Sequence, residues 1–394
     1  MKNALFRLAA LTLLALLFAV PACAQEAENI TAQCEFTASG GRKTSQFTDG
    51  AYTSYWLSDE RKGAYVEMRA PEDTPMYGLY ICFGQMPAAW EIQRQDENGQ
   101  WTACIQGDTR FLHAYVPLEG ETHLRLVSTG KKEAMKINEL MVLGAGEVPD
   151  WVQIWQEAPE KVDLLVISAH PDDELIFFGG TVPTYAAERG MNVLVAYMTA
   201  SNTTRSSELL NGLWLMGQRI YPAIGPFYDG YSLTLENGYK KWPKNQVRAF
   251  LTELIRRSRP DVVLTHDLDG EYGHGAHRVT ADATLYCVEH AADASFQEKS
   301  AALYGTWQVK KLYLHLYPEN QITMDWRVPL EAFGGKTGLE LARGAYALHV
   351  TQQTTPFVIE DSGETSCALF GLAYTTVGAD TAGGDFFENI VQGE

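Results

Sequence analysis

Short runs of consecutive apolar residues in the second half of the chain are each followed by polar residues. Leu164 to Ile167 forms the first run, and Asn192 to Thr199 and Asp261 to Thr265 form two more. Such a run, bounded by turn-forming residues, is typical of a strand buried on both faces of a parallel sheet. Lys311 to Tyr317 alternates apolar and polar residues and is expected to add a further strand, in which His315 is structural.

Helical patterns lie between these strands. Leu175 to Arg189 is predicted to form one helix, Ser206 to Met216 a second and Arg278 to Ala292 a later one. An amphipathic helix is predicted where apolar residues recur at i, i+3, i+4, i+7 and i+8: Val247, Phe250, Leu251, Leu254 and Ile255. This alternation predicts an α/β domain over residues 159–394, with a Rossmann-like, mostly parallel sheet and flanking helices.

Residues 31–147 show a different pattern, in which short β-rich runs alternate with turn residues. The runs are Gly63 to Met68, Tyr77 to Phe83, Trp90 to Gln93, His123 to Val127 and Ile137 to Leu143. Short strands at such spacing predict an antiparallel β-sandwich. Residues 144–159 are expected to link this sandwich to the α/β domain.

The first 24 residues have the order of a secretory signal peptide. Lys2 and Arg7 precede an apolar stretch from Ala9 to Val20, and a small-residue cleavage site, Ala22 to Ala24, follows. We therefore expect an exported protein, extracellular or at the cell surface. The stretch also resembles a bacterial lipoprotein signal, which would leave Cys23 lipidated, and an uncleaved signal is a further alternative. Membrane association is expected only through such an anchor.

Charge and cysteine content narrow the function classes. The formal net charge is −18 and no long basic run occurs, which argues against a nucleic-acid partner. The six cysteines show no CxxC spacing, so the sequence does not indicate a four-cysteine zinc site. After export, pairing among Cys34, Cys82 and Cys104, or of Cys287 with Cys367, competes with the alternative of free buried cysteines.

Candidate metal ligands follow two of the predicted strands. His170, Asp172 and Asp173 come directly after the first, and three histidines follow the strand at Asp261 to Thr265: His266, His274 and His277. Carboxyl ends of parallel strands are where open α/β sheets hold their ligands. Histidine with carboxylate suits zinc, and catalytic zinc keeps three protein ligands and one open position. The alternative is that these residues are capping and surface groups of two ordinary loops.

The string AHPDDE, from Ala169 to Glu174, and the distant string GHxxH, from Gly273 to His277, resemble the motifs of the PIG-L/LmbE-like deacetylases. These are zinc enzymes that remove N-acetyl groups from glucosamine-containing compounds. The resemblance extends roughly from Lys161 to the C-terminus. It implies that His170, Asp173 and His277 bind zinc, with another divalent metal such as Fe²⁺ as the alternative.

The same resemblance assigns catalytic roles. It implies that Asp172 is the general base, that His274 stabilises the oxyanion or donates a proton, and that Tyr272 helps to polarise the substrate carbonyl. Many members have Asp between the two histidines, where this chain has Ala276. We therefore expect a different acid from the same loop to orient His274: Asp267 or Asp269.

Two further positions resemble substrate-binding residues of the family. Arg205 matches an arginine that contacts substrate, although an i,i+3 pair with Glu208 on a solvated helix face explains it equally well. Asp229 lies in FYDGY, where family members have a substrate-side loop, and an ordinary Asp-Gly turn is the alternative.

The first half of the chain resembles another family. The string FTDGAYTSYW, with INELMVLG near the end of the segment, is similar to discoidin-type domains of the galactose-binding-like sandwich class. This resemblance implies a glycan ligand, on which Tyr55 and Trp56 would stack unless they are core or rim aromatics.

These observations predict a zinc-dependent hydrolase that removes the N-acetyl group from a GlcNAc-containing glycan or glycoconjugate, an N-acetylated amino-sugar substrate. Zinc would activate a water molecule and polarise the amide carbonyl. A carboxylate would take the proton of the water, and a histidine would stabilise the oxyanion. Two alternatives are a glycan-binding surface protein with a degenerate catalytic domain, and a metal-dependent amidase acting on a non-sugar acyl amide.

Overall fold

The structure is a computed structural model, which describes residues 25–200, 202–354 and 356–391. The predicted signal segment and Cys23 lie outside these residues. Within them, no helix has the length and apolar character needed to cross a membrane.

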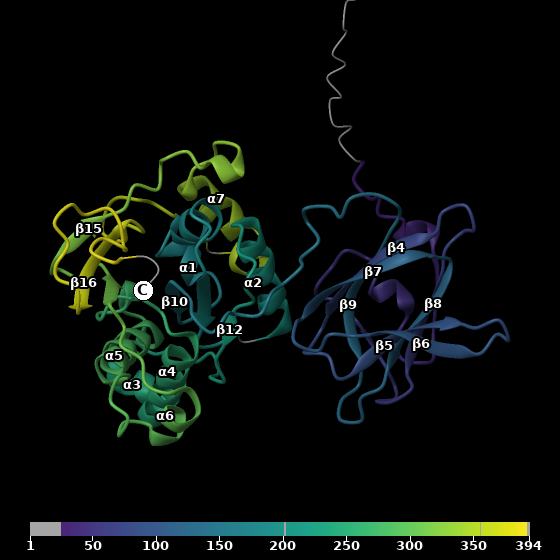
Figure 1. Cartoon of the computed structure of the whole chain (residues 1–394), viewed down its shortest axis with the longest axis horizontal. Helices are drawn as coiled ribbons and strands as arrows, with labels where there is room; N and C mark the ends of the chain where they lie inside the picture. The colour runs from purple at the N-terminus through teal and green to yellow at the C-terminus, as the bar shows by residue number, and fades with distance from the viewer. Residues whose placement is uncertain (1–24, 201, 355, 392–394) are drawn as a thin grey trace, which may run out of the picture.

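The first part of the described chain is the predicted sandwich of antiparallel strands (Figure 1). One sheet has the order β1-β3-β8-β5-β6 and the other β2-β9-β4-β7. The strands are β1 (Glu35–Ala38), β2 (Trp56–Leu57), β3 (Tyr65–Arg69), β4 (Met76–Phe83), β5 (Trp90–Gln95), β6 (Trp101–Gln106), β7 (His113–Glu121), β8 (His123–Ser128) and β9 (Lys136–Leu143). The pattern analysis missed four strands, β1, β2, β6 and β7. The residues of β6 are mostly exposed and therefore show no apolar alternation.

The second part is built on a seven-stranded sheet with the order β12-β11-β10-β13-β14-β16-β15. Its strands are β10 (Leu164–Ser168), β11 (Val193–Tyr197), β12 (Ala223–Ile224), β13 (Val262–Thr265), β14 (Lys311–His315), β15 (Gln321–Thr323) and β16 (Leu369–Thr375). The five strands from β12 to β14 are parallel, and β16 and β15 are antiparallel additions at one edge. The prediction of a mostly parallel sheet is confirmed.

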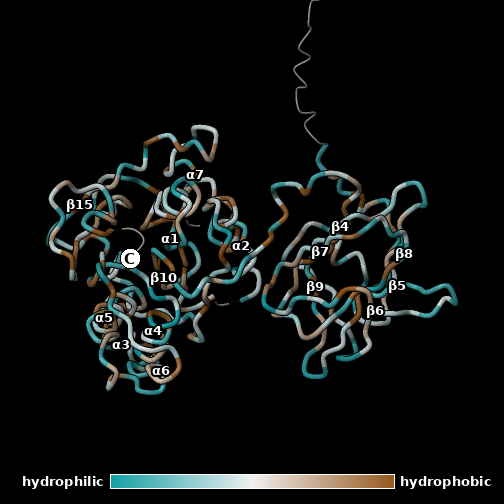
Figure 2. The backbone as a smooth tube through the Cα atoms, in the orientation of Figure 1, coloured by the Kyte–Doolittle hydropathy of each residue, from teal (hydrophilic) through white to brown (hydrophobic). Residues whose placement is uncertain are grey.

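Helices cover both faces of this sheet (Figure 1). They are α1 (Asp173–Ile176), α2 (Thr203–Leu215), α3 (Leu235–Lys241), α4 (Lys244–Ser258), α5 (Gly275–His290), α6 (Glu298–Tyr304) and α7 (Gly338–Ala347). Leu164 and Val166 of β10 pack in the cluster that includes α1, α2 and α7, whereas Leu165 and Ile167 pack with α4 and α5. Burial on both faces explains the continuous apolar run of β10, which the helices enclose (Figure 2).

The predicted helix from Leu175 to Arg189 is wrong as a single element. The chain instead forms the short α1, a turn and a π-helical segment, η3 (Pro183–Glu188). Gly179 has φ +52°, and a Cβ there would lie 2.7 Å from Sγ of Cys367. Close packing at this glycine, followed by a proline, interrupts the helix.

The suggested disulfides are also wrong, because all five cysteines in the described chain are free. Cys287 lies in the cluster on one face of the parallel sheet and Cys367 in the cluster on the other. Cys34 directly precedes the edge strand β1, Cys104 lies on the opposite edge strand β6, and Cys82 belongs to the other sheet. The alternative of unpaired cysteines is the correct one.

The sandwich packs directly on the α/β part, and the segment between them is part of that contact. Gln153 is buried, and its Nε2 donates to Oδ1 of Asn211 on α2 at 2.7 Å. The backbone N–H of Leu112 donates to the hydroxyl of Tyr221 at 3.2 Å. Within the segment 144–159, the side chains of Val152, Gln153 and Trp155 are buried, so this part of the expected linker takes part in the contact.

Candidate metal centre and active site

The first cluster of polar residues lies in the loop after β10, as its position in the sequence suggested. Pro171 turns the chain, and Asp173 begins α1. The backbone of Asp172 has φ +106°, in a region that residues other than glycine rarely adopt. This unfavourable backbone conformation lets two adjacent acids point in different directions.

Three side chains bring donor atoms together at the carboxyl end of the sheet. Nδ1 of His170 lies 3.3 Å from Oδ2 of Asp173 and 3.3 Å from Nε2 of His277, and that Nε2 lies 3.4 Å from Oδ1 of Asp173. Ligand atoms about 2.0–2.1 Å from a tetrahedral zinc ion are roughly 3.3 Å apart. The two histidine nitrogens have this spacing, and each lies at a similar distance from one oxygen of Asp173, so the residue types and the nitrogen pair are compatible with such an ion.

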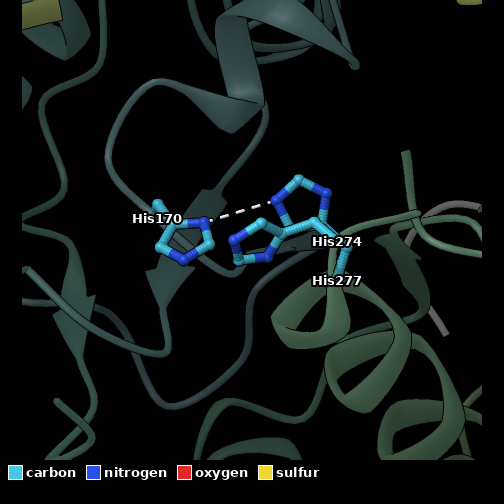
Figure 3. Close-up of side chains that lie close together, drawn as sticks. All are labelled: His170, His274 and His277. Atoms are coloured by element: carbon cyan, nitrogen blue, oxygen red, sulfur yellow. Dashed lines mark hydrogen bonds between the residues drawn. The ribbon is translucent and has the colours of Figure 1, made fainter. Parts of the chain in front are cut away.

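Two other histidines are close to this group, and each has one ring nitrogen that accepts a backbone hydrogen bond. Nε2 of His266 lies 3.3 Å from Asp173, but it accepts a hydrogen bond from the backbone N–H of Ala169 at 2.9 Å. Nδ1 of His274 accepts from the backbone N–H of Ala276 at 3.2 Å, so in the neutral ring the proton is on Nε2. Figure 3 shows His274 beside His170 and His277. Two sets of these side chains have one donor atom each within 4.8 Å of one another and could hold a metal ion: His170, His274 and His277, and Asp173, His266 and His277.

The hydrogen bond to Ala276 corrects one expectation. We expected an acid of the same loop to orient His274, but the backbone N–H at the start of α5 does so. Asp267 instead accepts from the backbone N–H of Asp269, whose own side chain is 92% exposed and lies 3.7 Å from Arg278. Burial is the largest influence that lowers the pKa of His274, to about 3, so the ring is neutral.

Glu271 is the main residue that the sequence analysis missed. Its buried carboxylate lies 2.8 Å from Nδ1 of three histidines: His266, His277 and His315. Burial alone would raise the pKa of Glu271, but these histidines, His266 foremost, hold it well below its ordinary value. A carboxylate on the far nitrogen of a ligand histidine fixes the ring orientation and tautomer. The histidines that surround Glu271 in the sequence were the feature that could have identified this residue as part of the site.

The two adjacent acids differ in their electrostatic environments. Burial, with the neighbouring charge of Asp173, raises the pKa of Asp172 well above its ordinary value. Burial also opposes ionisation of Asp173, but His277 and His170 keep its pKa well below the usual range. Asp173 therefore stays ionised among the donors. The raised pKa makes the carboxylate of Asp172 the stronger base of the two, so it binds a proton more readily.

Arg205 lies against the loop that contains Pro171 and Asp172. It donates to the carbonyl oxygen of Pro171, and its Nη2 lies 3.2 Å from Oδ1 of Asp172. The alternative of a solvated i,i+3 helix pair is wrong, because Arg205 is buried and the carboxylate of Glu208 accepts from the backbone and the hydroxyl of Thr351. The contact to Asp172 suggests that Arg205 positions this acid.

Asp229 and Tyr272 lie at the rim of the centre. Oδ1 of Asp229 is 3.7 Å from Nε2 of His170, the nitrogen turned away from His277. The ring of Tyr272 is centred 5.6 Å from that of His274, and its side chain is partly exposed. Both residues are therefore within reach of a molecule bound at the metal position.

In the sandwich, Trp56 is excluded from sugar stacking. It is fully buried, and its Nε1 donates to the carbonyl of Gly40 at 3.0 Å. The ring of Tyr55 has the cations of Arg42 and Lys136 each 4.1 Å from its centre. Glycan binding by the sandwich itself stays a prediction.

Comparisons with known proteins match the α/β part. Residues 165–288 match the family model described as "PIG-L: GlcNAc-PI de-N-acetylase". The chain is 28% identical over 258 residues to 1D-myo-inositol 2-acetamido-2-deoxy-alpha-D-glucopyranoside deacetylase 1 of Catenulispora acidiphila, covering 58% of this chain and 72% of the relative. It is 31% identical to the protein of that name from Frankia alni, covering 37% of this chain and 59% of the relative.

Solved structures match each part separately. N,N'-diacetylchitobiose deacetylase from Pyrococcus horikoshii aligns with 49% of this chain and 71% of its own, at 20% identity and a TM-score of 0.39. The family 32 CBM from C. perfringens NanJ, in complex with galactose, aligns with 28% of this chain and 94% of its own, at 14% identity and a TM-score of 0.24. The matched segment contains β13 and most of β10, the two strands that precede the candidate ligands, so the α/β part of this chain is similar to the PIG-L family of de-N-acetylases.

Proposed function

We propose that this protein is a zinc-dependent N-deacetylase, with a Rossmann-like catalytic domain, that acts on a GlcNAc-containing glycan or glycoconjugate. Fe²⁺ is the alternative metal. The observation that carries the proposal is that Nδ1 of His170 and Nε2 of His277 lie 3.3 Å apart, and that each lies 3.3–3.4 Å from a different carboxylate oxygen of Asp173. The PIG-L match and the printed activities of the relatives support the N-acetyl sugar as substrate.

A divalent ion held by these residues would lower the pKa of a water molecule and polarise the acetyl carbonyl. Asp172, one position from the ligand Asp173, would take the proton of the attacking water. Arg205 would hold Oδ1 of Asp172 in place. His274 would donate the proton on Nε2 to the oxyanion as a hydrogen bond, because its Nδ1 is occupied by the helix N-terminus.

The leaving nitrogen needs a proton when the C–N bond breaks. The neutral ring of His274 has one N–H, which the oxyanion would use, so we assign proton return to Asp172. The carboxyl group gains a proton from the water and gives it to the amine. Overall, the amide and one water molecule become acetate and an amino sugar.

The test is acetate release from a panel of compounds by the full-length protein. We expect turnover of N-acetylglucosamine conjugates, loss of turnover with a chelator and recovery with zinc. Elemental analysis of the isolated protein would distinguish zinc from iron. Turnover of N-acetyl amino acids alone would favour the non-sugar amidase, and metal binding without any turnover would favour a degenerate catalytic domain.

We also propose that the protein is exported, as the residue order from Lys2 to Ala24 suggests. Fractionation of the native host should find processed protein outside the cytoplasm. Labelling with palmitate that is lost in Cys23→Ala would identify the lipoprotein form, and full-length cytoplasmic protein would contradict export.

A further inference from the structure

A cleft of about 870 Å³ lies between the sandwich and the α/β part, beside the metal centre. Gln85, Met86 and Leu112 of the sandwich line it, and the segment from Tyr221 to Asp229 lines it from the other part. Its volume is in the range of ligand-binding sites. The catalytic domain alone would therefore have an incomplete cleft.

Asp229 connects this cleft to the metal centre. It lines the cleft, and its Oδ1 lies 3.7 Å from Nε2 of His170. A substrate whose acetamide reaches His170 can therefore extend past Asp229 into the cleft. The part of the substrate that is not hydrolysed would lie between the two domains.

Both walls of the cleft are anchored. The hydroxyl of Tyr221 accepts from the backbone N–H of Leu112 at 3.2 Å, and the hydroxyl of Thr203 donates to the carbonyl of Gly84 at 2.6 Å. On the far wall, the indole N–H of Trp242 donates to the backbone carbonyl of Tyr228 at 2.8 Å. These contacts preorganise the cleft before a ligand binds.

The chemistry of the lining favours an uncharged sugar chain. Aromatic and apolar side chains are exposed there, with Tyr228 at 58% and Met86 at 47% exposure. Amide and hydroxyl groups of Gln85, Asn202 and Ser206 lie among them. Among the described lining residues none is lysine or arginine, so the cleft lacks the cations that would favour phosphate or carboxylate groups.

Sugar rings match this mixture, because their C–H faces pack on apolar and aromatic surfaces and their hydroxyls bind amides and carboxylates. We infer that the substrate is a neutral oligosaccharide whose further sugar units bind in the interdomain cleft, with Met86 and Tyr228 as specificity-determining residues. This inference rests on the proposed function.

The experiment compares N-acetylglucosamine with tri-N-acetylchitotriose for the metal-loaded, full-length protein. Wild type should show a kcat/KM for the trimer at least about tenfold higher. Met86→Ala and Tyr228→Ala should each lower the trimer value roughly tenfold, the effect of losing one well-packed apolar contact, and leave the monosaccharide value unchanged. Leu303→Ala, an exposed leucine on α6 with 75% exposure, is the matched control and should change neither.

A binding measurement separates the cleft from catalysis. In the slow background Asp172→Asn, calorimetry should show that Met86→Ala weakens trimer binding about tenfold. Equal rates for both substrates in wild type, or equal losses on both in the cleft variants, would overturn the inference while leaving the deacetylase function intact. If wild type hydrolyses neither sugar, the proposed function fails and the inference fails with it.

Discussion

The carboxylate of Glu271 lies 2.8 Å from Nδ1 of His277, on the opposite side of the ring from the Nε2 that faces Asp173. Glu271 therefore provides a carboxylate beside Nδ1 of His277, while Nε2 of the same ring faces Asp173. The same carboxylate lies 2.8 Å from Nδ1 of His266 and of His315. The buried negative charge of Glu271 is therefore surrounded by three histidines.

Replacing Glu271 should weaken metal binding without removing a ligand. Glu271→Gln keeps the shape of the side chain but loses the charge, and we expect metal affinity to fall about 10–100-fold. Competition with a chelating dye measures this affinity. Glu139→Gln, at a buried carboxylate of the sandwich, is the control and should leave it unchanged. Equal metal affinity in Glu271→Gln and wild type would show that Glu271 does not orient His277 for metal binding.

Asp172 and Asp173 should have separable roles. Asp172→Asn preserves polarity and suits the positive φ of this position, where asparagine is tolerated. It cannot accept a proton, so kcat should fall by about 10²–10⁴ with metal content retained and KM little changed.

Asp173→Ala should lose metal together with activity, because it removes one of the three proposed protein ligands. Elemental analysis and steady-state kinetics on both purified variants test the pair of assignments. Loss of metal in Asp172→Asn with retention in Asp173→Ala would reverse the two roles.

His274 should affect the reaction rate rather than metal binding. His274→Asn retains a side chain that can cap α5, so the helix should remain, but the imidazole N–H is lost. We expect kcat to fall about 10²–10³-fold, as for an oxyanion-hole donor, with normal metal content. A fall in metal content as large as the fall in kcat would instead make His274 a ligand.

His113 should make the interface between the sandwich and the α/β part sensitive to acid. Burial lowers its pKa from 6.5 to about 4, and its ring contacts the hydroxyl of Tyr80 and Oε1 of Gln153, each at 2.9 Å. Below pH 6.5 the unfolded state binds a proton that the folded state excludes, so stability falls until about pH 4. The cost is about 2 kcal/mol at pH 5.

Urea unfolding at pH 7 and pH 5 measures this effect. His113→Gln cannot titrate, so its stability should fall by about 2 kcal/mol less than that of wild type between these pH values. The contributions of other buried histidines cancel in the comparison. Parallel losses in the two proteins would show that His113 does not titrate on unfolding.

The sequence by itself determined the local structure and half of the site. The apolar run of β10 and the apolar stripe of α4 are short-range patterns in the sequence. In the structure, the residues of these patterns lie on the buried faces of the two elements. His170 and Asp173 share one loop, so their proximity follows from three residues of spacing. The helix after this loop was mispredicted because Gly179 is packed against Trp326 and Cys367, both more than a hundred positions away in the sequence.

Contacts between distant segments were decided by the tertiary structure. β10 and β13 are neighbours in the sheet, and this pairing brings the loop of His170 to the start of α5. The environment of Asp172 depends on Arg205 from another helix, and the cleft depends on how the sandwich packs against Tyr221. Sequence periodicity shows which face of an element is buried, but not which distant side chain will lie against it. The orientation of the catalytic groups and the extent of the substrate cleft therefore follow from the sheet order and the domain interface.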